Sequence, residues 1–239
     1  GDPDFVDMPI AQLVDKNYAA GLRAGIRADR ATPSASLPGA PASPEGTDTT
    51  HFSVVDAQGN VVSATLSVNI PFGSGFVPPG TGVLLNDEMD DFSAREGSPN
   101  TYGLIGTHAN AIAPGKRPLS SMTPTILRRG DTVAVLGTPG GSRIISMVLL
   151  GALTFADGNA DPAAWVSTGR YHHQFWPDVI EYEPEGLPDT DRAGLERLGH
   201  TLKPVDRRYG NMQAIAWQPA SGDMKAASDP RRQGSAQVR

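Results

Sequence analysis

The sequence of 239 residues predicts an α+β fold. Some segments carry apolar residues at helical spacing, while others look like strands that return as antiparallel hairpins. A third observation is the content of 27 glycines and 21 prolines, which predicts many sharp turns and few long helices. Because helices and strands occur in mixed order and no internal repeat is evident, the pattern indicates the α+β class.

The first helix is predicted between Ile10 and Ile26. Its apolar residues follow one another at spacings typical of an amphipathic helix, and Pro9 suits the first turn. The polar run Asp15-Lys16-Asn17 divides the pattern and can split the helix in two. The stretch from Ala31 to Asp48 contains four prolines and has no apolar periodicity. It is predicted to be an exposed linker that is open to cleavage.

A first hairpin is predicted from strands at His51–Asp56 and Val61–Val68, with a turn at 57–60 between them. A loop rich in glycine and proline follows from Pro71 to Gly82, and a short strand is predicted at Val83–Leu85.

A second hairpin is predicted from Thr123–Arg128 and Thr132–Gly137, and it leads through Gly140-Gly141-Ser142 into an apolar helix at Arg143–Phe155. The remaining predicted elements are two helices and three strands. The helices are Pro162–Ser167 and Thr190–Leu198, and the strands are Val179–Glu183, Thr201–Val205 and Met212–Gln218.

Composition excludes several classes of partner. A formal net charge of −6 and the lack of a basic cluster argue against a nucleic-acid or anionic-membrane partner. The absence of cysteine excludes a disulfide framework and a thiolate metal site. No apolar run approaches the roughly 18 residues that a membrane span needs, and no export signal is expected at the N-terminus shown.

Thr49 is the candidate nucleophile, because it opens the run Thr49–Asp56 directly after the linker. A threonine hydroxyl needs a base beside it, and cleavage of the Asp48–Thr49 bond would supply one, namely the new α-amino group of Thr49 itself. The unperturbed pKa of such an amine is about 7.7 to 8.0, so a sizeable fraction would be neutral near pH 7. Taken alone, however, the Thr49–Thr50 pair is better interpreted as part of an ordinary strand after a loop.

Three polar motifs are candidate binding groups. Glu88 and Asp91 are three residues apart and can share one face of a turn, where two carboxylates would bind an ammonium group, although acidic loops are often merely solvated. The Gly140–Gly141 pair lies between a strand and a helix start, where backbone N–H groups can bind an anion or simply form a tight turn. The Ser120–Ser121 pair before Met122 is, on its own, best interpreted as a turn or cap.

In their order and spacing, these motifs resemble those of the γ-glutamyltransferases, which are N-terminal-nucleophile enzymes. The resemblance extends from about Gly1 to about Arg231 and rests on five segments. These are Thr49–Asp56, Leu84–Phe92, Lys116–Thr125, Thr138–Ile145 and Ala227–Arg231. It implies a four-layer αββα sandwich, in which two antiparallel sheets lie between helices. Residues 1–48 would then be the C-terminal end of a large subunit with its linker, and residues 49–239 the small catalytic subunit.

The resemblance also implies roles for individual residues. Thr49 matches the N-terminal nucleophile, while the amides of Gly140 and Gly141 match the oxyanion hole. Ser67 stands where the family usually has a threonine, whose hydroxyl binds the amino group of the nucleophile and supports self-cleavage. Serine keeps this hydroxyl, so we expect the chemistry to be retained, with slower maturation as one consequence of the lost methyl group.

The remaining matched positions would recognise the glutamate part of the substrate. Glu88 and Asp91, with Asn69 nearby, would bind the α-amino group, and Ser120 and Ser121 would bind the α-carboxylate. The family also uses an arginine of the large subunit here, and that arginine lies outside this chain. Residues 1–48 therefore cannot complete the pocket.

The function implied is self-cleavage at Asp48–Thr49, followed by transfer of a γ-glutamyl group from glutathione or a related amide to Thr49 and then to water, an amino acid or a dipeptide. The partner would be the large subunit of the same precursor, no metal or organic cofactor is required, and a periplasmic or extracellular location is expected. Two alternatives stay open. One is an amidohydrolase similar to the glutaryl-cephalosporin acylases, whose substrates have no ammonium group for Glu88 and Asp91 to bind. The other is an unprocessed, catalytically silent fragment.

Histidines do not indicate a metal site. His172 and His173 are adjacent, so in a strand they point in opposite directions, and no spaced histidine or cysteine completes a tetrahedral set. They are interpreted as packing residues, and His51 as a strand residue that supports Thr49 rather than as a general base.

Overall fold

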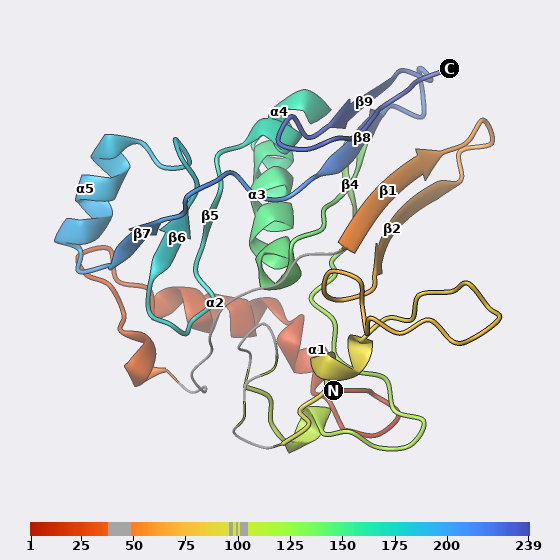
Figure 1. The fold of residues 1–239 in the computed structure, drawn as a ribbon. Coiled ribbons are helices and arrows are strands. Elements are labelled where there is room, and N and C mark those ends of the chain that lie inside the picture. The colour runs from red at the N-terminus through yellow and green to blue at the C-terminus, as the bar shows by residue number, and fades with distance from the viewer. Residues whose placement is uncertain (38–48, 96–97, 99, 101–104) are drawn as a thin grey trace.

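The computed structural model describes residues 1–37, 49–95, 98, 100 and 105–239. The chain has the α+β fold that the sequence predicts, with three separate sheets and helices against them (Figure 1). Most of the predicted linker, residues 38–48, and with it the Asp48–Thr49 bond, lies outside the described residues. Within the described part of the chain, no helix is long and apolar enough to cross a membrane.

The N-terminal helix is split, as the polar run indicated. Helix α1 is Ile10–Leu13 and α2 is Lys16–Ala24. Asp15 separates them by capping α2, since its side chain accepts hydrogen bonds from the backbone N–H groups of Asn17 and Tyr18. The apolar stripe predicted from the sequence is present but exposed, and neither helix buries a residue.

One part of the predicted linker is not exposed. Ser34, in the 3-10 helix η1 (Ser34–Ser36), is buried, and its backbone N–H donates to the carboxylate of Asp178 at 2.8 Å. This tertiary hydrogen bond overrides the local composition, so the expectation of an exposed linker is wrong at Ser34.

The first predicted hairpin consists of β1 (Thr49–Val55) and β2 (Val61–Ser67). The strands are antiparallel, with Val55 opposite Val61 next to the turn and Thr49 opposite Ser67 at the open end. Asp56 shapes the turn by accepting hydrogen bonds from nearby backbone N–H groups.

The central sheet has four antiparallel strands in the order β3-β4-β8-β9. Three of them were predicted to within about two residues. The fourth, β9, was missed because its small and polar residues carry no clear alternation. The strands are β3 (Thr125–Arg129), β4 (Thr132–Gly137), β8 (Gln213–Trp217) and β9 (Met224–Ser228).

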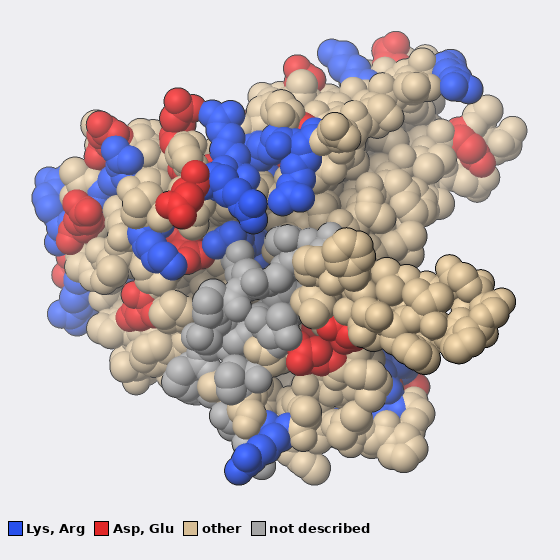
Figure 2. Space-filling view, in the orientation of Figure 1, with Lys and Arg blue, Asp and Glu red and all other residues tan. Residues whose placement is uncertain are grey.

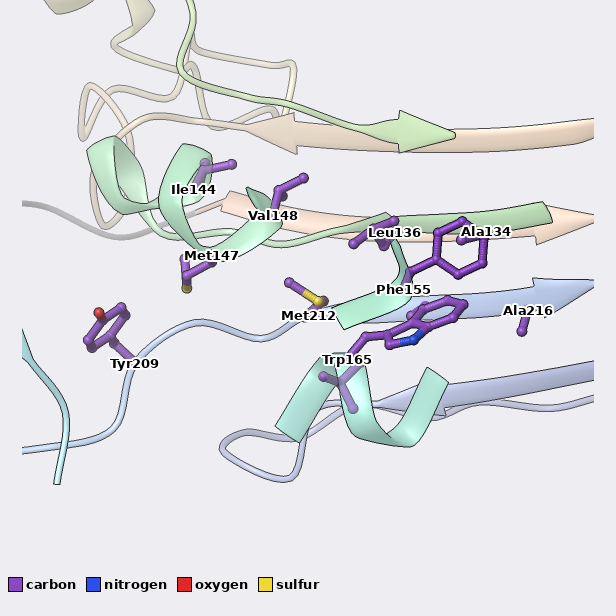
Figure 3. Close-up of a cluster of buried hydrophobic side chains, with 12 residues drawn as sticks. Ala134, Leu136, Ile144, Met147, Val148, Phe155, Trp165, Tyr209, Met212 and Ala216 are labelled. Atoms are coloured by element: carbon purple, nitrogen blue, oxygen red, sulfur yellow. The ribbon is translucent and has the colours of Figure 1, made fainter. Parts of the chain in front are cut away.

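The two faces of this sheet bury different partners, because successive side chains of a strand point to opposite sides. One face, with Leu136, packs against α3 (Ile144–Ala156) and α4 (Pro162–Ser167) in the main core (Figure 3). The other face, with Val135, packs against the β1–β2 hairpin.

Helices, central sheet and hairpin thus form three successive layers. The outer face of the hairpin is not covered by any described residue, since Phe52, Val54, Val62 and Leu66 are exposed there.

The third sheet, β5-β6-β7, departs from the all-antiparallel expectation. Strand β6 (Ile180–Tyr182) is antiparallel to β5 (Tyr171–His172) but parallel to β7 (Leu202–Pro204). The reason is α5 (Asp189–Arg197), which carries the chain back between β6 and β7.

The predicted strand at Val83–Leu85 is wrong. Only Leu85 pairs with the preceding loop, by donating its N–H to the carbonyl of Phe76 and accepting from the N–H of Ser74. Two backbone hydrogen bonds at one residue do not make a strand. The segment is irregular and exposed until the 3-10 helix η2 (Glu88–Asp91) begins. The other 3-10 helices are η3 (His108–Asn110) and η4 (Gly141–Arg143).

A buried ionic cluster of Arg170, Glu183, Asp229 and Arg231 ties β6 to β9. Arg170 and Asp229 are joined at 2.5 Å, with side chains 2% and 0% exposed. Arg231 bonds both carboxylates and also donates to the backbone carbonyls of Val166 and Thr168 at the end of α4. Every carboxylate is therefore met by guanidinium groups, which is the condition for burying charge.

Candidate active site

The hydroxyl of Thr49 lies at the open end of the hairpin, where the register places it opposite Ser67. The two hydroxyl oxygens are 3.0 Å apart, which is a hydrogen bond. Ser67 also accepts a 2.8 Å hydrogen bond from the backbone N–H of Asn69. This fixes Ser67 Oγ beside Thr49 Oγ1, so the two residues that the sequence assigned to one function are in direct contact.

Asn69 links the hairpin to the acidic turn. It is buried, and its backbone has a φ of 73°, a left-handed conformation that asparagine adopts more readily than most residues. Its side-chain amide donates to the carbonyl of Asp87, and the carboxylate of Asp87 accepts from the N–H of Ile70. These bonds position η2 against the end of β2.

Glu88 and Asp91 lie at the two ends of η2 and face the same pocket. The pKa of the Asp91 carboxyl is raised to about 7, first by burial and then by the hydrogen bond and the negative charge of Glu88. Oε1 of Glu88 is buried and has no hydrogen-bond donor among the described residues. Two half-buried carboxyl groups, one with an oxygen that has no donor among the described residues, are suited to bind a cation with several N–H donors, such as an ammonium group.

Ser120 and Ser121 line the same pocket from the segment before β3. Ser120 also forms a local turn, since its hydroxyl accepts from the backbone N–H of Met122 at 3.1 Å. The turn that composition alone favoured is thus present, and it holds the serine pair at the edge of the pocket.

Gly140 and Gly141 form the turn between β4 and α3. Their φ angles are 148° and 56°, which residues with a side chain rarely adopt. A Cβ on Gly140 would lie 2.4 Å from Cε of Met147, so a larger residue would also displace the end of that side chain. Gly141 lines the pocket that contains Thr49, whereas Gly140 lines a different pocket that opens beside Arg143.

The structure therefore brings the predicted site residues together around Thr49, except for Gly140. Those lining one pocket are Thr49, Ser67, Asn69, Glu88, Asp91, Ser120, Ser121 and Gly141. Its volume is about 20 Å³, far below the ~300 Å³ of small ligand sites.

Two buried histidines contact the segments beside the glycine turn. His51 is buried two residues after Thr49, hydrogen-bonded to Thr65 and Ser53, and burial lowers its pKa to about 4. A Cβ on Gly137 would lie 2.2 Å from the His51 ring, so the ring packs tightly on the end of β4. The neutral ring of His51, with both nitrogens in hydrogen bonds, supports β1 and is poorly placed to act as a base.

His172, in β5, supports the residues that follow the glycine turn. It is buried and hydrogen-bonded to Ser146 and to Gln174, and Gln174 accepts from the hydroxyl of Ser142 in η4. The neighbouring His173 lies just after β5, is exposed and bonds Asp178, so the two histidines have different environments. This series of hydrogen bonds from β5 to the glycine turn was not identified from the sequence. No motif in the sequence predicts that Ser142, Gln174 and His172 bind one another.

Comparison with known proteins gives a consistent result. The family described as gamma-glutamyltranspeptidase matches residues 1–238. The glutathione hydrolase proenzyme of Pseudomonas sp. (strain A14) is 51% identical over 242 residues, which cover 97% of this chain and 42% of that protein. The corresponding proenzyme of Escherichia coli (strain K12) is 45% identical over 233 residues, which cover 97% and 40%.

A solved structure agrees with these matches. The crystal structure of a mutant gamma-glutamyltranspeptidase from Helicobacter pylori has a TM-score of 0.72 and 42% sequence identity, and the match covers 77% of this chain and 100% of that one. The chain spans only about two fifths of the length of the curated relatives.

Proposed function

The chain belongs to the gamma-glutamyltranspeptidase family, and from this premise we propose that the protein transfers or hydrolyses γ-glutamyl groups through an acyl-enzyme on Thr49. The donor is glutathione or another γ-glutamyl amide, and the acceptor is water, an amino acid or a dipeptide. The observation that carries the proposal is the single pocket that Thr49 shares with Glu88, Asp91 and the serine pair.

The chemistry begins with cleavage of the Asp48–Thr49 bond, in which the Thr49 hydroxyl attacks the preceding carbonyl and water hydrolyses the resulting ester. The freed α-amine is then the base for the same hydroxyl. Ser67 supports this step, because its hydroxyl is within 3.0 Å of Thr49 Oγ1 and would orient it. The large subunit released by the cleavage is proposed to stay bound and to complete the pocket.

In the catalytic cycle, Thr49 Oγ1 attacks the γ-carbonyl carbon of the donor while its proton passes to the α-amine. The amine then protonates the leaving nitrogen, and the C–N bond breaks. Water or an acceptor amine attacks the ester, and the proton returns to the hydroxyl. The backbone amides of the Gly140–Gly141 turn are proposed to stabilise the oxyanion, for which single donors are worth ~3 kcal/mol in other enzymes.

Recognition of the donor is proposed to divide between two ends of the pocket. Glu88 and Asp91, with Asn69, bind the α-ammonium, while Ser120 and Ser121 bind the α-carboxylate. The acidic pair also separates this proposal from the alternative of a glutaryl-cephalosporin acylase, whose substrate has no ammonium group for two carboxylates to bind.

A pair of substrates tests this choice. We expect the mature full-length enzyme to turn over a γ-glutamyl anilide with a kcat/KM at least about 10-fold above that of the desamino glutaryl anilide, since charge-assisted hydrogen bonds to the ammonium are lost in the second. Steady-state release of the aniline measures both. A preference for the glutaryl compound would establish the acylase alternative. If neither compound is turned over, the protein is the catalytically silent alternative.

The pH dependence of this preference follows from Asp91. Because burial raises its pKa to about 7, the carboxyl is mostly protonated in more acidic solution and attracts the ammonium less. The ratio of the two kcat/KM values is therefore expected to rise with pH through about 7, while titration of the Thr49 amine cancels in the ratio. In Asp91→Asn the ratio should be low and independent of pH. A ratio that stays constant in the unaltered enzyme would contradict the role of Asp91.

A location outside the cytoplasm is also proposed. It is supported by the family alone, and fractionation of cells that produce the full-length protein tests it.

A further inference from the structure

Asn110 joins the two ends of the proposed donor site without lining it. The residue is 4% exposed and lies at the end of η3, and it is not among the described residues that line the pocket of Thr49. Its side-chain Nδ2 donates to the backbone carbonyl of Asp91 at 2.7 Å, and its Oδ1 accepts from the backbone N–H of Leu119 at 3.0 Å. One buried amide therefore connects the acidic turn with the residue before the serine pair.

The orientation of this amide follows from its two partners. If Nδ2 and Oδ1 of Asn110 were exchanged, an N–H would face the N–H of Leu119 and an oxygen would face the carbonyl of Asp91. Both contacts would be repulsive, so the donor end faces the acidic turn and the acceptor end faces the serine segment. An ionised aspartate of the same size could make only the second of these bonds, because it has no hydrogen to donate.

On the acidic side, the bond from Asn110 holds the end of η2, where Asp91 lies. The chain just beyond is held as well, because Ser93 donates its N–H to the backbone carbonyl of Asn110 at 2.9 Å. Figure 2 shows acidic side chains gathered just right of the centre, at the place of the yellow coil of η2 in Figure 1. The two bonds fix the backbone on both sides of Phe92 and so limit where the carboxyl group of Asp91 can lie.

On the serine side, the segment before the serine pair is held at three points. Lys116 Nζ donates to the carbonyls of the two residues that flank Asn110, at 3.0 and 2.8 Å. Arg117 forms two side-chain bonds and one backbone bond with the buried carboxylate of Asp2. Leu119, the last residue before the pair, is bonded to Asn110 itself. The serine pair is therefore presented from a fixed backbone.

The separation of these two ends matters because an α-amino acid carries its ammonium and its carboxylate on one carbon atom. A site that binds both groups must keep its two sets of ligands at one separation. Asn110 lies 19 positions after Asp91 and 9 positions before Leu119, so local chain geometry alone does not set this separation. A link that fixes it before the substrate arrives lowers the cost of ordering the site on binding.

We propose that Asn110 is a positioning residue that sets the separation between the ammonium-binding carboxylates and the carboxylate-binding serines. The inference rests on the proposed function and concerns the substrate specificity of the same site. With both bonds of Asn110 in place, a donor with an ammonium and a carboxylate on one carbon contacts Asp91 and Ser120 at once. Without them, both ends of the site persist but their separation varies, so each charged group of the donor contributes less to binding.

Three anilides measure the contribution of each charged group. The mature full-length enzyme is assayed with the γ-glutamyl anilide, with the desamino glutaryl anilide, and with the analogue whose α-carboxylate is replaced by a carboxamide. The ratio of kcat/KM for the first to that for the second reports on the ammonium, and the ratio of the first to the third reports on the carboxylate. In Asn110→Ala we expect both ratios to fall about 10-fold, mainly through a higher KM for the γ-glutamyl anilide. A smaller amount of correctly folded enzyme would cancel in both ratios.

Asn110→Asp tests the bond to the acidic turn alone and keeps the size of the side chain. Its carboxylate still accepts from the N–H of Leu119 but has nothing to donate to the carbonyl of Asp91. We expect the ammonium ratio to fall about 10-fold in this variant. The added negative charge would by itself favour an ammonium, so a fall in this ratio reports the lost hydrogen bond.

Asn211→Ala is the matched control. Asn211 also donates one side-chain bond to a backbone carbonyl, that of Gln233, and accepts one, from Gln213, but it is not among the described residues that line the pocket of Thr49. Both ratios should therefore keep their original values in this variant. A fall in only one ratio, or in neither, in Asn110→Ala would overturn the inference and leave the proposed function intact, as would an unchanged ammonium ratio in Asn110→Asp. If the unaltered mature enzyme does not turn over the γ-glutamyl anilide, the proposed function is wrong, and this inference with it.

Discussion

Replacing Thr49 by alanine is expected to lower the kcat for γ-glutamyl anilide hydrolysis by about 10⁴- to 10⁶-fold, as happens when other covalent hydrolases lose their nucleophile. The same change should leave the full-length precursor uncut, because one hydroxyl performs both reactions. The physical reason is that Thr49 Oγ1, hydrogen-bonded to Ser67 at 3.0 Å, is the nucleophile of the proposed mechanism. Electrophoresis of the precursor and release of the aniline measure the two effects.

Thr49→Ser is the control for this prediction. Serine keeps the hydroxyl and its partner Ser67 but loses the methyl group that restricts the side-chain rotamer. Cleavage and turnover should therefore persist at a reduced rate. If Thr49→Ala matures and turns over substrate as the unaltered protein does, the assignment of the nucleophile is wrong.

Replacing Asp229 by asparagine is expected to lower the free energy of unfolding by about 3–5 kcal/mol, since it leaves two guanidinium groups buried with a single carboxylate. Asp229 is 0% exposed and bonds both Arg170 and Arg231, and it also accepts from the backbone N–H of Met212. The Tm of the mature protein should fall by several degrees as a result. Thermal unfolding of the mature protein measures it.

Asp189→Asn is the matched control, because it breaks an arginine–aspartate pair at the surface. Asp189 pairs with Arg192 in α5, and its side chain is 92% exposed. Exposed pairs contribute about 0–1 kcal/mol, so the Tm should hardly change. Equal shifts in Tm for the two variants would show that the buried cluster has no special role in stability.

The parts of the fold that sequence predicted are those with strong local signals. The hairpin at Thr49–Ser67 has alternating residues around a turn with Asp56 and Gly59, and the apolar run of α3 is bounded by the glycine turn. The elements that were missed or misjudged depend on distant partners. Strand β9 exists because it pairs with β8, and Ser34 is buried because Asp178 accepts its N–H.

The site, like the fold, was predicted where the signal is local in the sequence. The motifs identified its residues, and the structure brings all but Gly140 into one pocket. What sequence did not supply is the support behind them, namely the link from His172 through Gln174 to the glycine turn and the cluster around Asp229. The hydrogen bond from Ser142 to Gln174 joins positions 32 residues apart, and the pair of Arg170 and Asp229 joins positions 59 apart. No periodicity encodes such long-range pairs.

The most direct test is the chemical state of Thr49 in an active preparation. The mature enzyme is quenched during turnover of a γ-glutamyl donor and digested, and the peptide that contains Thr49 is analysed by mass spectrometry. The account predicts a peptide that begins at Thr49, with a free α-amine and a γ-glutamyl ester on its hydroxyl. An active enzyme in which Thr49 is still joined to Asp48, or in which the γ-glutamyl group is attached to another side chain, would contradict it.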